Sequence, residues 1–200
     1  MTILPLTYLG NTEYFGILMR GECIIDIHEN YVKQSYRNRC EIMTANGVSS
    51  LTVNVREGGS AKKHAMCDIR TDNSKRWQHQ HWRAMISAYG KSPYFEHYIG
   101  YFEKFYLHEY EYLSEFSIGL LETVTKLLKI PTILRYSDSY VTGGENDLDL
   151  RGYFKPSKSI TDITRFKRYE QVFSDRQEFR ANLSVIDLLF CEGPSAKDFL

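Results

Sequence analysis

The chain has 200 residues, and its 25 Lys and Arg side chains balance its 25 Asp and Glu side chains. This zero net charge excludes a global attraction to duplex nucleic acid or to an anionic membrane, so recognition of charge must be local. No apolar run approaches the ~18 residues of a membrane span, no charged leader opens the chain, and the four cysteines form no Cys-x-x-Cys pair. We therefore expect a cytoplasmic protein without a transmembrane segment, forming one domain over residues 1–200.

The first 28 residues predict a strand, a helix and a second strand. Residues 2–9 favour a strand, although Pro5 cannot donate a hydrogen bond within a sheet. The turn at 10–12 leads into a short helix over 13–20, and the apolar run at 23–28 indicates a buried strand. Such a compact βαβ start indicates a parallel pair of strands.

The segment Tyr31–Arg39 is rich in groups that form directed hydrogen bonds. It holds three cations, two amides, a hydroxyl and two phenols within nine residues. If the segment is extended, Arg37 and Arg39 share one face and Asn38 lies on the other. Paired arginines suit phosphate or carboxylate, so we predict an anion site. The alternative is a solvated edge strand protected by its charges.

A hairpin, a loop and three helices follow. Residues 40–44 and 49–55 are extended runs joined through Asn46-Gly47, a strong hairpin signal. The glycine-containing loop at 56–64 is either a plain surface loop or one that closes over a ligand. Apolar stripes predict helices over 77–89, 95–106 and 113–128, with Ser74 and then Ser92-Pro93 as starting signals for the first two.

The last third of the chain is less regular. Residues 132–136 predict a strand that returns to the sheet. Residues 137–162 begin as an acidic, glycine-bearing loop and become basic and polar over 151–159; this region is either an active-site loop or a flexible flank. Residues 166–173 are expected to be extended. Asn182 or Ser184 caps a final helix, which Gly193-Pro194 ends.

Several residues are candidates for chemistry. Asp26 lies in an apolar strand and needs a partner, for which we expect an arginine of the following segment. Arg39 next to Cys40 predicts a lowered thiol pKa, although we do not favour Cys40 as a nucleophile. His81 falls on an apolar stripe and is expected to be a core histidine. No phosphate-loop, dinucleotide-binding or metal-ligand motif is present, so no metal site is expected and the cofactor is unknown.

Taken together, these motifs resemble the WbqC-like family of bacterial proteins. Tyr8, Tyr14 and Phe15 fit the family's Tyr-x-Pro-Trp-x-Gly-Tyr-Phe element, with Gly10, Asn11 and Glu13 in place of its proline, tryptophan and glycine. Further similar elements are Lys33, Ser35, Tyr36, Asn38 and Arg39; Asn46-Gly47 and Leu51–Val53; Trp77, His81, Trp82 and Ala88-Tyr89; Pro93–Phe95; Tyr169–Phe173; and Asn182–Phe190. The chain lacks much of the family's middle region and looks like the shorter subgroup of Bacteroides-type bacteria.

The resemblance implies a transferase of surface-polysaccharide (O-antigen-type) biosynthesis, with transfer of glycine or another amino acid to an amino sugar as the finer expectation. The alternatives are a nucleotidylyltransferase-like enzyme and a non-catalytic binding or scaffold protein in glycan assembly. We expect a small-molecule or glycan-precursor ligand with anionic groups; the sequence does not indicate an oligomeric state.

We predict a single three-layer α/β domain with a Rossmann-like start, a β-hairpin excursion and a helical layer. Ligands in such folds bind at the carboxyl ends of the strands. This rule gathers the candidate substrate-binding residues around one cleft: Thr7, Tyr8, Asn11, Lys33, Arg37, Asn38 and Arg39. His28 is the predicted general base, because the ordinary pKa of histidine is near neutrality.

Overall fold

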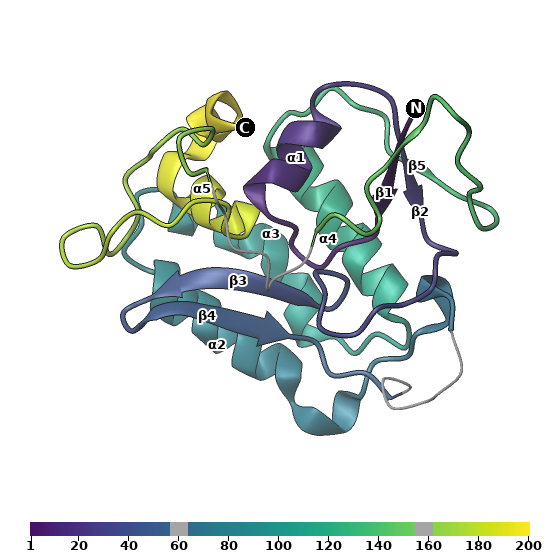
Figure 1. The fold of residues 1–200 in the computed structure, drawn as a ribbon. Coiled ribbons are helices and arrows are strands. Elements are labelled where there is room, and N and C mark those ends of the chain that lie inside the picture. Colours follow the sequence, from purple (N-terminus) through teal and green to yellow (C-terminus); the bar gives the residue numbers. More distant parts are fainter. Residues whose placement is uncertain (57–63, 155–161) are drawn as a thin grey trace.

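The computed structural model describes residues 1–56, 64–154 and 162–200. Figure 1 shows a small parallel sheet at one end of the molecule, with the β3–β4 hairpin and α2 below it. The strands are β1 (Thr2–Pro5), β2 (Cys23–Asp26), β3 (Arg39–Thr44), β4 (Gly47–Thr52), β5 (Arg135–Tyr136) and β6 (Leu148–Asp149). The helices are α1 (Thr12–Leu18), α2 (Trp77–Tyr89), α3 (Phe95–Leu107), α4 (Leu113–Leu127) and α5 (Val185–Glu192), with short 3₁₀ turns at Met66–Asp68, Asn73–Lys75 and Gly193–Phe199.

The four-stranded sheet is parallel, in the order β5-β2-β1-β6. In chain order this is 3-2-1-4, the strand order of one end of a Rossmann-type sheet. The sheet is flanked by helices and accompanied by the antiparallel hairpin, so the predicted Rossmann-like α/β architecture is confirmed. The order reverses between β1 and β6, and this reversal is where such sheets open a crevice at the carboxyl ends of their strands.

The predicted βαβ start is confirmed, with shorter elements than the sequence indicated. β1 ends at Pro5, and the chain then leaves the sheet, because the N–H of Tyr8 donates to the carbonyl of Tyr36 at 2.8 Å. α1 begins after Asn11, whose side chain accepts from the N–H of Tyr14 at 3.0 Å. Its buried face packs toward the core through Tyr14 and Phe15, among others.

The hairpin is also confirmed. β3 and β4 pair antiparallel, with Thr44 opposite Gly47, and Gly47 adopts a φ of +102°, which favours glycine. The hairpin lies against α2 (Figure 1). The N–H of Met43 in β3 donates to the hydroxyl of Tyr89 in α2 at 3.3 Å. This hydrogen bond ties the hairpin to the helical part of the molecule.

The three predicted central helices are confirmed, and their aromatic side chains form much of the core. The ring of Phe116 on α4 contacts the rings of Tyr8, Trp77, Phe105, Tyr106 and Tyr110. The Ser74 cap is wrong: α2 begins at Trp77, after Arg76 with a φ of +47°. α4 leads back to β5 as predicted, although β5 has only two residues.

The C-terminal part differs most from prediction. The short strand β6 lies inside the expected loop, and residues 166–173, all of which the structure describes, contain no strand. α5 begins after Ser184 as expected, but the Ser184 hydroxyl donates to the carbonyl of Leu9 at 2.8 Å instead of capping the helix. Gly193 ends α5 with a φ of +55°, which confirms the predicted end of the helix. Most of the loop expected at 56–64 lies outside the described residues.

Candidate functional site

A cluster of charged side chains lies at the carboxyl edge of the parallel sheet. Asp26 ends β2 and Asp149 ends β6, while Glu29, Arg37 and Arg151 come from the segments that leave this edge. This is the edge at which open α/β sheets bind their ligands.

Asp26 holds three strand ends together. It is fully buried and accepts hydrogen bonds from the N–H of His28 at 2.9 Å, the hydroxyl of Ser137 at 2.9 Å and the N–H of Val141 at 3.1 Å. Its charge is paired with Arg151, whose Nη1 is 2.6 Å from Oδ2. The prediction that an arginine of the next segment pairs with Asp26 is therefore wrong: the partner comes from the segment after β6. Asp26 is fully occupied in fixing the site.

Glu29 and Arg37 form a second, almost completely buried pair. Arg37 Nε donates to Glu29 Oε1 at 2.9 Å and Nη2 contacts Oε2, while each side chain is only 5% exposed. Arg37 also donates to the Ser35 hydroxyl at 3.3 Å and to the Arg151 carbonyl at 3.0 Å. Burial raises the pKa of Glu29 to about 7 although Arg37 acts in the opposite direction. A carboxyl group with a pKa near neutrality can accept and return a proton.

These side chains line a cavity of about 450 Å³, here called the edge pocket; its lining is Glu29, Asn30, Val32, Arg37, Tyr140, Asp149, Arg151 and Gly152. Tyr140 is 54% exposed and presents its ring beside the guanidinium of Arg151, whose central carbon is 4.6 Å from the ring centre. An open aromatic ring next to carboxylates offers one flat apolar surface and several hydrogen-bond acceptors.

The edge pocket has no surplus positive charge. Arg151 donates to both oxygens of Asp149, to Asp26 and to the carbonyl of Val141, so its N–H groups are largely occupied. Counting the buried Asp26, three carboxylates face two guanidinium groups in the cluster. The arrangement therefore suits hydroxyl or ammonium groups of a ligand better than a phosphate.

The structure brings the opening strand and the basic segment together, but it buries most of the predicted ligand contacts. Thr7, Tyr8, Asn11 and Asn38 are buried. The Tyr8 hydroxyl lies 2.9 Å from both His81 Nδ1 and the Tyr106 hydroxyl, and the Asn38 amide donates to the carbonyl of Val53 at 3.0 Å. His81 is thus the core histidine that its position on the apolar stripe predicts.

The segment around Arg37 is not extended. Residues 33–38 form consecutive turns, and Gln34 has a φ of +53°. Arg37 and Arg39 therefore do not share a face: Arg37 enters the buried pair with Glu29, whereas Arg39 Nε donates to the Thr52 hydroxyl of the hairpin at 3.2 Å. Lys33 is exposed. Of the predicted ligand contacts, the edge pocket includes Arg37.

His28 and Cys40 also differ from their expected surroundings. His28 is at the same sheet edge, with Nδ1 3.5 Å from Cys67 Sγ, but it does not line the edge pocket. Cys40 is fully buried, and burial raises the pKa of its thiol well above the ordinary value. The prediction of a lowered thiol pKa is therefore wrong, because Arg39 is directed away to Thr52.

The first N–H groups of α1 are hydrogen-bonded to other parts of the protein. The N–H of Thr12 donates to the carbonyl of Leu183 at 3.0 Å, and the N–H of Glu13 donates to the side-chain oxygen of Asn182 at 3.0 Å. The N–H of Tyr14 is bonded to Asn11. A phosphate group therefore has no open N–H groups to bind at this point, where nucleotide-binding folds commonly offer them.

Sequence reasoning missed Glu29, Tyr140, Asp149 and Arg151 as members of the site. The segment 137–162 was expected to be either an active-site loop or a flexible flank. It supplies three of these four residues, Tyr140, Asp149 and Arg151. Its signal was the clustering of polar groups and glycines. Nothing in the sequence indicated that Arg151 pairs with an aspartate 125 residues earlier.

Comparison with known proteins shows which family the chain belongs to. The model of the WbqC-like protein family matches residues 7–161, more than half of the chain. The chain belongs to the WbqC-like protein family. It is also similar to the uncharacterized protein Rv1507c of Mycobacterium tuberculosis (strain H37Rv), with 26% identity over 228 aligned positions that cover all of this chain and 96% of the relative. No solved structure matches it.

The family match ends at residue 161, so the similarity noted for 169–190 lies outside it. Within the described residues, no helix combines the length and apolar character needed to cross a membrane. The same part of the chain holds no group of three or more His, Cys, Asp and Glu side chains arranged to bind a metal ion.

Proposed function

We propose that this WbqC-like chain is a transferase of surface-polysaccharide assembly and that its edge pocket binds the sugar acceptor. Family membership supports a role in polysaccharide-related biosynthesis. The observation that carries the proposal is the edge pocket itself, in which Glu29, Asp149 and the open ring of Tyr140 meet at the carboxyl edge of a parallel sheet. A sugar ring stacks on an aromatic face, and its hydroxyl and amino groups donate to carboxylates.

The proposed reaction is the transfer of glycine, or another amino acid, to an amino sugar. The amino nitrogen attacks the carbonyl carbon of an activated aminoacyl donor, a C–N bond forms, the bond to the leaving group breaks, and the nitrogen loses a proton. We assign this proton to Glu29 in place of His28, because Glu29 lines the edge pocket and its pKa is about 7. The negative balance of the cluster favours binding of the acceptor as the ammonium ion, which gives its first proton to Glu29 and so frees the nitrogen lone pair for attack; the second proton leaves with the departing group.

The two alternatives differ in what they need from the structure. A nucleotidylyltransferase-like enzyme needs a phosphate site, and the closed amino end of α1 does not support one there. A non-catalytic binding protein predicts that no sugar stabilises the isolated chain. A cytoplasmic location, and one domain over residues 1–200, are part of the proposal.

The test is a thermal-shift screen with glucosamine, galactosamine and their UDP-linked forms, with glucose as the neutral comparison. A ligand at about 100 times its Kd adds roughly 2.7 kcal/mol to the free energy of unfolding. We expect an amino sugar to raise the Tm of the wild type and of Tyr101→Ala, but not of Tyr140→Ala. These tyrosines are matched in exposure, at 55% and 54%, and only Tyr140 lines the edge pocket. An equal shift in both variants contradicts the assignment.

A further inference from the structure

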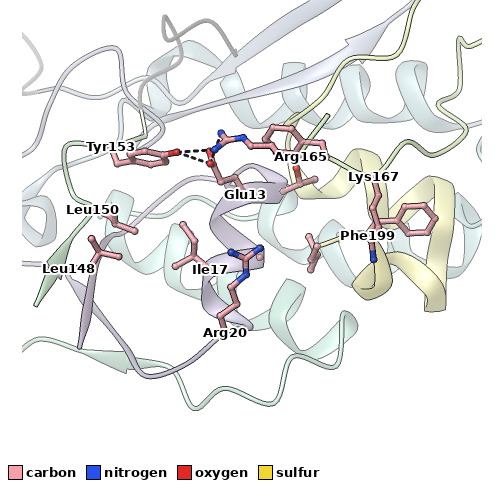
Figure 2. Close-up of a pocket in the computed structure, with 13 residues that line it drawn as sticks. Glu13, Ile17, Arg20, Leu148, Leu150, Tyr153, Arg165, Lys167 and Phe199 are labelled. Carbon is pink, nitrogen blue, oxygen red and sulfur yellow. Dashed lines mark hydrogen bonds and ion pairs between the residues drawn. The ribbon is translucent and has the colours of Figure 1, made fainter. Parts of the chain in front are cut away.

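A second cavity, of about 570 Å³, lies on the other side of the β6 segment (Figure 2). It is bounded by α1, by β6 and by the segments around Arg165 and Phe199, and is here called the α1 pocket. Successive side chains of an extended segment point to opposite faces. Accordingly Leu148 and Leu150 line the α1 pocket, whereas Asp149 and Arg151 line the edge pocket.

One part of the α1 pocket is apolar. Ile17 of α1 faces Leu148 and Leu150 of the β6 segment, and Phe199 lies across from them (Figure 2). Leu148 is 57% exposed, so part of its side chain is in contact with water. Covering these side chains with an apolar ligand group would remove them from water.

The charges in the α1 pocket are unequal. Arg20, Arg165 and Lys167 line it together with one acidic side chain, Glu13, and with the last residue of the sequence, Leu200. Glu13 is already occupied: Arg165 Nη2 is 2.6 Å from Oε1, and the Tyr153 hydroxyl donates to the same oxygen at 2.7 Å. The three cationic side chains outnumber Glu13 and the main-chain carboxylate of Leu200 taken together, so the pocket has an excess of positive charge, which favours an anion.

Arg20 is the cation available for that anion. Its guanidinium has no hydrogen-bond or ion-pair partner among the described residues, whereas Lys167 donates to the carbonyl of Asp198. Figure 2 shows the Arg20 guanidinium next to Ile17, in the middle of the pocket. A free guanidinium beside apolar side chains matches a ligand with one anionic group and one apolar group.

We propose that the α1 pocket binds a single-chain amphipathic anion of the alkyl phosphate class. Its anionic group pairs with Arg20, and its apolar chain covers Ile17, Leu148 and Phe199. The occupant is a soluble molecule that enters the cavity and not a membrane surface, because the site is a concave pocket whose floor is α1. This site goes beyond the proposed function, which concerns the edge pocket.

Titration calorimetry with decyl phosphate below its micelle concentration tests the proposal. We expect saturable binding by the wild type and binding weaker by about tenfold or more in Arg20→Gln, the loss typical of one charge-assisted contact. Arg83→Gln is the control, because Arg83 is exposed like Arg20 and lies outside the α1 pocket. Equal affinity in the two variants overturns the proposal.

Two further ligands test the role of the apolar side chains and the choice of a soluble ligand over a membrane surface. Inorganic phosphate is expected to bind much more weakly than decyl phosphate, and binding of both with similar affinity overturns the role of the apolar side chains. Vesicles of phosphatidylcholine containing phosphatidic acid are expected not to bind, and binding to vesicles without binding to the monomer overturns the choice of a soluble ligand. Amino-sugar binding is expected to be unchanged in Arg20→Gln, so the two proposals can fail separately.

Discussion

Replacing Arg37 by alanine is expected to destabilise the fold far more than the same change at Arg39. Arg37 is almost fully buried, and its removal leaves the Glu29 carboxylate without the two hydrogen bonds that neutralise it. Breaking a buried ion pair by removing one partner costs about 3–5 kcal/mol. The Arg39 side chain is partly exposed and donates to the Thr52 hydroxyl, so its loss is expected to cost about 1 kcal/mol or less.

The loss of unfolding free energy in Arg37→Ala is expected to depend on pH in a defined direction. The pKa of Glu29 is about 7 in the folded chain, above the ordinary value of about 4.3, so the folded state holds this proton more tightly. Its contribution to the stability is complete below about pH 4 and is lost as the pH rises through about 7. In Arg37→Ala the carboxyl group has lost its cation and holds the proton still more tightly. The destabilisation is therefore expected to be largest near pH 8 and smaller near pH 5, both values being approximate.

Urea unfolding of the wild type and the two variants at both pH values measures these free energies. The double variant Glu29→Leu/Arg37→Met removes both charges and is expected to recover much of the loss, because an uncompensated buried charge is the main cost. If Arg37→Ala and Arg39→Ala cost the same, or if the cost of Arg37→Ala is independent of pH, the description of the buried pair is wrong.

Three further variants test the core. Tyr8→Phe removes a hydroxyl that lies 2.9 Å from both His81 and Tyr106, and urea unfolding is expected to show a loss of about 1–3 kcal/mol; no loss would contradict the hydrogen bonds. Burial lowers the pKa of His81 to about 4, so its contribution to the stability is present above about pH 6.5 and is lost as the pH falls through 4. His81→Asn, which cannot titrate, is expected to show a flatter dependence of unfolding free energy on pH over that range, and identical slopes would refute the neutral histidine. Gly193→Ala is expected to lower the Tm, with a cost of about 1–3 kcal/mol, because Gly193 has a φ of +55° and an added Cβ would lie 2.5 Å from the Tyr94 ring; an unchanged Tm would refute this close contact.

Much of the fold could be predicted because its signals are local. The turn and helix that follow β1 depend on Asn11 as a cap, the hairpin depends on Asn46-Gly47, and three helices carry continuous apolar stripes. β6 could not be predicted in the same way. It has two residues, and it exists because Leu148 and Asp149 align with Thr2 and Ile3, more than 140 positions earlier in the chain.

The candidate site was only partly predictable, for a related reason. Of the basic segment, Arg37 lies at the carboxyl edge of the sheet, where the sequence placed the candidate cleft. Its sequence does not reveal that turns replace an extended strand, nor that the guanidinium is neutralised by Glu29. A cation that binds a ligand and a cation held in an internal ion pair look alike in a sequence, because the difference depends on which distant carboxylate the fold brings close.

A crystal structure of the chain soaked with the amino sugar that gives the largest thermal shift tests the edge-pocket proposal most directly. The proposal predicts the sugar ring against Tyr140, with its amino group within hydrogen-bonding distance of Glu29 or Asp149. A sugar bound at another surface, with the edge pocket filled by water alone, would contradict it.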